Sequence, residues 1–191
     1  SDDYYGYTDN ACWQYSVTGL EDGNIVDYTF VQKVKEVFDP QAPPKTRIFK
    51  VEFLSFPGEE DPIESYLARV ETNEGIINYY NITSHEFVGE DIIVIGYDFG
   101  YIQEQNLLHV APLKVGHETP MGKVESCKEV DLPIGRMEAF KVHEIYSIPI
   151  IDERVLTREA EVWIVPYIGI VRANEKWTEK GIETDKTEAK L

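Results

Sequence analysis

The stretch VDYTFVQKVKEVF, residues 26 to 38, decides the fold class. Val26, Tyr28 and Phe30 are apolar, and the residues between them are polar. Successive side chains of a β-strand point to opposite faces of the sheet, so this period of two predicts a half-buried strand. Residues 47 to 54 repeat the pattern after a loop rich in proline. We therefore expect these two stretches to pair as a long hairpin.

Strand-like runs continue along most of the chain, and no stretch longer than about ten residues has a convincing helical period of 3.6. Parallel neighbours need crossover helices, which this sequence does not supply, so the strands are expected to be antiparallel. The predicted fold is mainly β, with little helix, and the strands could form a barrel, a sandwich or a half-open sheet. The further runs cover residues 65 to 83, 92 to 97, 123 to 131, 138 to 148, 153 to 165 and 168 to 177.

The chain has 191 residues and a mass of 22.0 kDa, a size at which one hydrophobic core suffices. We expect a single β domain over residues 1 to 177. Residues 178 to 191 are polar and have few apolar side chains, so they are expected to form a C-terminal tail or a loose edge strand.

Charge and hydropathy exclude some partners. The formal net charge is -17 and the pI is near 4.6, so the surface repels phosphate backbones and anionic lipid head groups. We expect no nucleic-acid partner. No run of 18 apolar residues exists, so we expect no transmembrane segment. The chain begins at Ser1 rather than Met, as a mature or trimmed chain would, and a signal peptide or lipid-bearing N-terminus would lie outside it.

Catalytic motifs are absent from the sequence. The four histidines are widely spaced, and the closest pair, His109 and His117, does not have the spacing of a zinc site. Neither a Gly-x-Ser-x-Gly nucleophile elbow nor a phosphate-binding loop occurs. We therefore predict no catalytic residue, no metal and no cofactor. Two distant carboxylates could still act together as in a glycosidase, which one sequence does not reveal.

Aromatic side chains are the enriched resource, with 12 tyrosines and 8 phenylalanines. Most are expected in the core, and the remainder could line a concave face that binds a sugar, lipid or peptide. The candidate ligand-binding residues are Trp13, Tyr15, Tyr28, Tyr80, Trp163 and Tyr167.

Only two cysteines are present, Cys12 and Cys127. They could pair as a disulfide in an exported protein, or be separate buried thiols in a cytosolic one.

Three segments carry a resemblance to a family. VWIVPYIGIVR, residues 162 to 172, resembles the C-terminal Trp-x-x-Pro-x-x-Gly-x-Val-basic segment of exported, mostly uncharacterised bacterial proteins of the DUF3108 kind, often lipoproteins. YYGYTDNACWQY, residues 4 to 15, is similar to their opening segment, and APLKVGHETPM, residues 111 to 121, to a middle one. The resemblance implies an exported, curved antiparallel sheet of half-barrel type in the periplasm or cell envelope. It implies no catalytic residues.

Three hypotheses about function follow from these patterns. The leading one is a non-enzymatic exported domain that binds a lipid or other amphipathic ligand on a concave aromatic face, or serves as an envelope scaffold. The second is a glycan-acting hydrolase with paired carboxylates. The third is a protein-interaction module that adds a strand at an exposed edge such as residues 168 to 177. The shape of the sheet, filled or hollow, separates the first hypothesis from the others.

Overall fold

The computed structural model of the chain describes residues 6, 8–38, 46–58, 61–71, 77–89, 91–98, 112–119, 122–149, 155–179 and 182–191. This part consists of β-strands joined by turns and contains no helix, which confirms the expected fold class. The strands are β1 (Cys12–Glu21), β2 (Asn24–Phe38), β3 (Thr46–Phe56), β4 (Ile63–Glu71), β5 (Ile77–Val88), β6 (Asp91–Asp98), β7 (Glu118–Thr119), β8 (Gly122–Leu132), β9 (Gly135–Pro149), β10 (Val155–Val165), β11 (Gly169–Glu179) and β12 (Ile182–Lys190).

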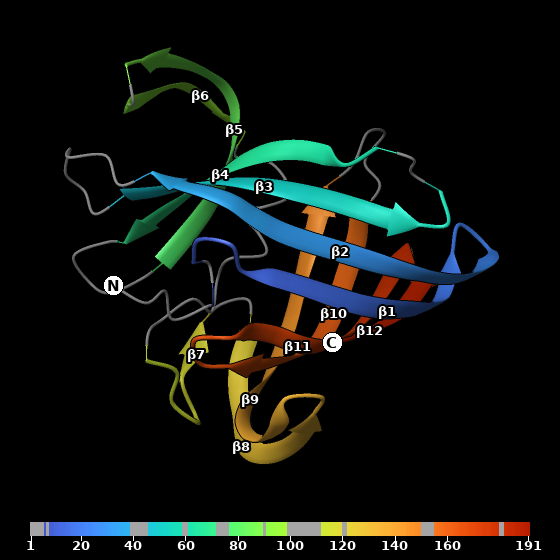
Figure 1. The fold of residues 1–191 in the computed structure, drawn as a ribbon. Helices are drawn as coiled ribbons and strands as arrows, with labels where there is room; N and C mark the ends of the chain where they lie inside the picture. The colour runs from blue at the N-terminus through green and yellow to red at the C-terminus, as the bar shows by residue number, and fades with distance from the viewer. Residues whose placement is uncertain are drawn as a thin grey trace.

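All the strands belong to one antiparallel sheet in the order β6-β5-β4-β3-β2-β1-β12-β11-β10-β9-β8-β7 (Figure 1). Neighbours in the sheet are therefore neighbours in the chain, except at the centre, where β1 pairs with β12. The predicted hairpin of β2 and β3 is present. The loop expected at residues 39 to 45 lies outside the described residues.

The C-terminal segment differs from the expectation of a tail or loose edge strand. β12 is an internal strand, paired with β1 on one side and β11 on the other. Ala189 lies across from Val17 and from Ala173, so its small side chain faces the same side as the core residues. The proposed edge at residues 168 to 177 is also incorrect, because β11 is paired with both β10 and β12.

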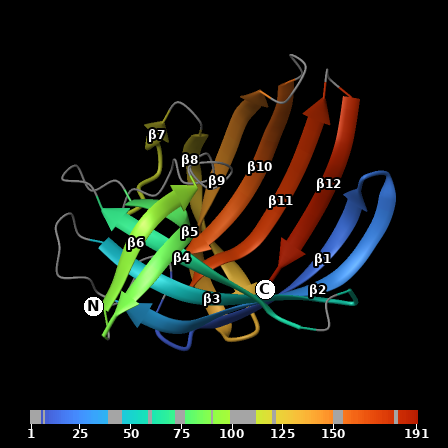
Figure 2. The ribbon, with the colours of Figure 1, turned by 90° about the horizontal axis from the view of Figure 1, so that it is seen from above.

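The largest core cluster among the described residues lies on one face of the sheet, here called the inner face, which carries Trp13, Tyr15 and Val17. Two smaller clusters, one with Ile48 and one with Ala139, are separate from it. The opposite face is called the outer face. Phe49 of β3 and Val142 of β9 are fully buried in the largest cluster, although their strands are far apart in the sheet order. The sheet therefore curls so that its two halves face each other; Figure 2 shows β8 to β12 side by side, with β1 to β3 curling across them. Burial of each such side chain contributes about 1.5 to 3 kcal/mol.

Tight turns fix how the strands meet. Asp22 and Gly23, both with positive φ, connect β1 to β2 as a two-residue hairpin turn. Pro166, Tyr167 and Ile168 connect β10 to β11; Tyr167 has a φ of 67°. The predicted runs at residues 153 to 165 and 168 to 177 thus correspond to β10 and β11, which are consecutive strands of a hairpin.

Candidate functional site

Trp13 and Tyr15 lie in the core and hold the turn between β10 and β11. The indole Nε1 of Trp13 donates a hydrogen bond to the carbonyl oxygen of Ile168 at 2.6 Å. The hydroxyl of Tyr15 donates to the carbonyl oxygen of Ile170 at 2.9 Å. Both aromatic side chains are less than a tenth exposed, so they satisfy backbone acceptors that β-pairing leaves open. The early aromatic segment and the C-terminal segment, which sequence comparison treats separately, are thus in direct contact.

Tyr28 also lies on the inner face, at the end where polar side chains replace the apolar core. Its hydroxyl donates to Glu21 Oε1 at 3.1 Å. Burial and the nearby Glu21 carboxylate raise the pKa of Tyr28 to about 12. Tyr80 belongs to β5, and its side chain lies outside the described residues.

The two remaining aromatic candidates lie elsewhere. Trp163 is half-buried on the outer face, where Lys141 lies 5.7 Å and Arg172 4.8 Å from its ring centroid. Tyr167 is 61% exposed at the turn. The structure therefore places Trp13, Tyr15 and Tyr28 on one face of the sheet and Trp163 on the other.

Both cysteines are free thiols, so the disulfide considered from the sequence is not formed. Cys12 is exposed, next to the buried Trp13 in a strand whose side chains alternate between faces. Cys127 pairs with Phe140 and is half-buried. Burial, together with the negative charge of Glu138, raises the pKa of the Cys127 thiol.

The histidines do not assemble a metal centre within the described residues. His143 contacts Glu159 at 3.2 Å through Nε2, and the ring of His85 lies 4.2 Å from that of Tyr66. Over the part of the chain that the structure describes, no group of three or more His, Cys, Asp or Glu side chains is placed to hold a metal ion. His109 lies outside this part.

A network of charged side chains occupies the polar end of the inner face. Arg158, only 6% exposed, lies 2.9 Å from Glu144 and 2.5 Å from Glu175. The guanidinium also lies 5.5 Å from the ring centroid of Tyr146, and Trp177 Nε1 donates to Glu175 Oε1 at 2.5 Å. One cation thus serves two carboxylates, and none of these residues was singled out from the sequence.

The two members of the Glu144 and Arg158 pair respond differently to burial. Burial raises the pKa of the Glu144 carboxyl, and the attraction of Arg158 only partly opposes this change. Burial works against the charge of Arg158, but the combined effect of Glu175, Tyr146 and Glu144 outweighs it, so the pKa of Arg158 is raised. Burial thus makes the neutral form of the Glu144 carboxyl more favourable, although Arg158 lies beside it.

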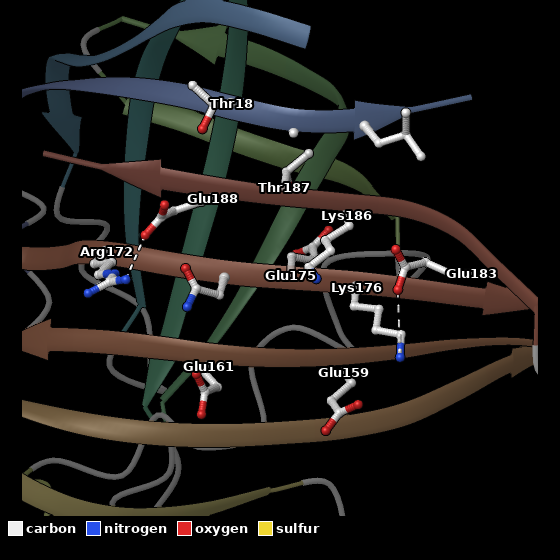
Figure 3. Close-up of a pocket in the computed structure, with 13 residues that line it drawn as sticks. Thr18, Glu159, Glu161, Arg172, Glu175, Lys176, Glu183, Lys186, Thr187 and Glu188 are labelled. Carbon is white, nitrogen blue, oxygen red and sulfur yellow. Dashed lines mark hydrogen bonds and ion pairs between the residues drawn. The ribbon is translucent and has the colours of Figure 1, made fainter. Parts of the chain in front are cut away.

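A groove of about 590 Å³ lies across β1, β12, β11 and β10 on the outer face (Figure 3). Because directly paired residues of adjacent strands face the same side, Thr18, Glu188, Asn174 and Glu161 form one row across these four strands. Arg172 and Lys186 line the groove on either side of this row. The floor needs Gly19, since a Cβ there would come within 2.0 Å of the carbonyl oxygen of Lys186.

Most charges in the groove are paired. Arg172 lies 2.6 Å from Glu188, and Lys176 lies 3.8 Å from Glu183, as the dashed lines in Figure 3 mark. Glu161 pairs with Lys141, which lies outside the groove, and this hydrogen bond lowers the pKa of the Glu161 carboxyl. Hydrogen bonds from Lys190 and Arg172 likewise lower the pKa of the Glu188 carboxyl.

The groove could not be predicted from the sequence, because its row combines residues about 170 positions apart, such as Thr18 and Glu188. The signal that was present is the alternation of charged and small side chains in residues 182 to 190, which indicates a strand with one polar face. The sequence predicts no transmembrane segment, and the described residues contain no helix that could span a bilayer.

Comparison with known proteins identifies a fold and no family. No protein-family model and no curated protein sequence matches the chain, so the resemblance to the DUF3108 family is not confirmed. A crystal structure from Bacteroides fragilis NCTC 9343, of a protein assigned as exported and with a YmcC-like fold, matches with a TM-score of 0.54 at 12% identity, covering 100% of this chain and 98% of that one. A crystal structure from Parabacteroides distasonis ATCC 8503, of a protein assigned as a lipoprotein, matches with a TM-score of 0.50 at 13% identity, covering 100% and 97%. At such low identity the likeness concerns architecture alone. Over its whole length, this chain is similar to the YmcC-like fold.

Proposed function

We propose that the chain is a non-enzymatic, exported domain of the bacterial cell envelope that binds a polar partner in its outer-face groove. The observation that carries this proposal is which face of the sheet has room for a ligand. The inner face is filled by its own core side chains, whereas the groove of about 590 Å³ lies on the opposite, charged face. Concave sites of this size are the usual places for ligands.

The envelope location is supported by the full-length likeness to one protein assigned as exported and another assigned as a lipoprotein. We extend that location to this chain as part of the proposal. An acidic, strongly charged surface favours solubility outside the membrane and disfavours adsorption to anionic lipids.

The amphipathic-ligand hypothesis, with Trp13, Tyr15 and Tyr28 as binding residues, is less well supported. A lipid chain on the inner face would displace side chains such as Phe49 and Val51, which are fully buried. Loss of such packing costs about 2 to 5 kcal/mol for each large side chain removed. We therefore assign binding to the outer face.

The pKa directions support a binding role over hydrolysis. A glycosidase needs one carboxyl with a raised pKa to protonate the leaving group. In the groove, the pKa values of Glu161 and Glu188 are both lowered by their cationic partners. Glu144 has a raised pKa, but it lies on the inner face and is bonded to Arg158.

Two measurements test the proposal. Cells that produce the protein from its complete gene are fractionated, and we expect the protein in the periplasmic or envelope fraction; recovery from the cytosol alone would contradict an exported role. Separately, the purified protein is incubated with neutral oligosaccharides, and no new reducing ends are expected. Hydrolysis that disappears in Glu161→Gln or Glu188→Gln would replace the binding role by a catalytic one.

A further inference from the structure

We infer that the groove binds an uncharged, hydroxyl-rich ligand, a segment of neutral glycan, through Asn174 and Arg172. This inference rests on the proposed function and specifies its ligand. It follows from which groups in the groove are already bonded and which are not.

The carboxylates of the outer-face groove have partners within the protein. Glu161 is bonded to Lys141, and Glu188 to Arg172 and Lys190. Glu159 contacts His143 at 3.2 Å, and Glu183 contacts Lys176 at 3.8 Å. A cationic ligand would compete with these partners, and an anionic polymer would approach a protein of net charge -17. Charge therefore favours a neutral ligand.

Two polar atoms of the groove residues are buried without a hydrogen-bond partner, namely Asn174 Oδ1 and Arg172 Nε. They belong to residues two apart on β11, so both side chains are on the outer face. One atom is an acceptor and the other a donor. Leaving such a group unsatisfied carries the full desolvation cost of that group, and a ligand that bonds to both atoms recovers part of this free energy.

The neighbouring side chains keep these two atoms in position. A hydrogen bond from the Asn174 amide to Glu161 contributes to the lowered pKa of that carboxyl, so the amide nitrogen is engaged and the oxygen is left as acceptor. The guanidinium of Arg172 lies over the Trp163 ring and bonds Glu188 through Nη2, which leaves Nε as donor. Groups that are already oriented lose little conformational entropy when a ligand binds.

A hydroxyl group matches this pair because it donates and accepts at one oxygen. A sugar hydroxyl would accept from Arg172 Nε and donate to Asn174 Oδ1, and adjacent hydroxyls would reach Thr18 in the row or Lys186 beside it. Neither atom is exposed to solvent, so long side chains of the groove must shift when the ligand enters. Rotamer changes of surface side chains occur in nanoseconds and do not require the sheet to open.

Titration followed by NMR tests the inference. Uniformly ¹⁵N-labelled protein is titrated with maltohexaose, cellohexaose and mannohexaose, and with the hexasaccharides of galacturonate and chitosan as charged arms. We expect saturable shifts of the Asn174 side-chain amide and the Trp163 indole with at least one neutral hexasaccharide. Affinity for both charged arms should be weaker by about tenfold or more, equivalent to about 1.4 kcal/mol.

Matched variants assign the shifts to the groove. Asn174→Ala should weaken neutral binding by about tenfold, whereas Gln14→Ala, on the outer face of β1 but outside the groove, should change it less than twofold. Circular dichroism of each variant verifies that it folds.

Equal or tighter binding of a charged arm at Asn174 would overturn the neutral-glycan assignment and leave the groove as a binding site. Unchanged affinity in Asn174→Ala would overturn the role of that residue. No saturable shift of groove residues with any of the five hexasaccharides would overturn the inference, whereas the proposed envelope function is tested separately by fractionation.

Discussion

Trp13 donates its indole proton to the carbonyl oxygen of Ile168 across 2.6 Å, joining residues that are 155 positions apart. The bond fixes the first strand of the sheet to the turn between β10 and β11. Gly6 completes the contact, because a Cβ at this residue would lie 2.3 Å from the same carbonyl oxygen. The turn that contains the candidate binding residue Tyr167 is thus an internal anchor of the fold.

Trp13→Phe should lower the free energy of unfolding by about 1 to 3 kcal/mol, because the Ile168 carbonyl loses its donor in a buried place. Urea unfolding followed by circular dichroism measures the change. Trp163→Phe serves as the control, since Trp163 is half-buried on the outer face, where it makes cation–π contacts and packs against a small apolar cluster, and phenylalanine keeps an aromatic ring for both. Equal losses in the two variants would contradict the anchoring role.

Arg158→Met should destabilise the protein by about 3 to 5 kcal/mol at neutral pH, because Glu144 and Glu175 then remain buried without their shared cation. The loss should shrink in acid, where the carboxyls become protonated. Arg172→Met removes a more exposed ion pair and should cost less than about 1 kcal/mol. Thermal unfolding of both variants at several pH values makes the comparison.

Glu144→Gln should change the pH dependence of stability. The pKa of Glu144 is raised in the folded state, so its contribution is fully present below the ordinary carboxyl pKa and is lost as the pH rises through the raised value. Glutamine keeps an acceptor for Arg158 and does not titrate. The variant should therefore gain stability relative to the wild type between acidic and neutral pH, and a constant difference would count against the raised pKa.

Tyr28→Phe should reduce the loss of stability in alkali. The pKa of Tyr28 is about 12 against an ordinary 10.0, so the folded state keeps a proton that the unfolded chain releases. Stability from this group is present below pH 10.0 and is lost as the pH approaches 12. Absorbance at the tyrosinate band is followed during a pH titration of the variant and the wild type. The titration step that the variant lacks is the ionisation of Tyr28.

The two thiols should differ in reactivity. Cys12 is exposed, whereas Cys127 is half-buried and its raised pKa reduces the thiolate that reacts. A disulfide reagent followed by peptide mass spectrometry should modify Cys12 first in the folded protein and both thiols equally in urea. Faster labelling of Cys127 in the folded state would be inconsistent with its burial.

The strands with large apolar residues at alternate positions were predictable, and β2 with its partner β3 is the clearest case. β12 was not predicted as an internal strand, because its inner positions carry small residues such as Thr187 and Ala189, whose burial depends on the neighbours Val17 and Ala173. The Asp22-Gly23 turn was readable as a hairpin signal, which would have indicated β1.

The candidate site was less predictable than the fold. In the sequence, Arg158 belongs to a strand in which charged and apolar side chains alternate, which is an ordinary pattern. Its burial results from the curl of the sheet, which the sequence does not show. The aromatic candidates were chosen for their chemistry, yet Trp13 and Tyr15 are bonded to backbone carbonyls that no local pattern marks. The pairing register between strands that are distant in the sequence determines both the burial of Arg158 and the hydrogen bonds of Trp13 and Tyr15.

The pairing of β1 with β12 has a thermodynamic consequence. These two strands share five paired residues, from Ser16 with Lys190 to Leu20 with Lys186, and through them the β1–β6 half of the sheet is hydrogen-bonded to the β7–β12 half. The groove straddles this seam. A molecule held there would act as a clamp between the two halves, so occupancy would stabilise the entire domain by mass action, and melting temperature would report on saturation.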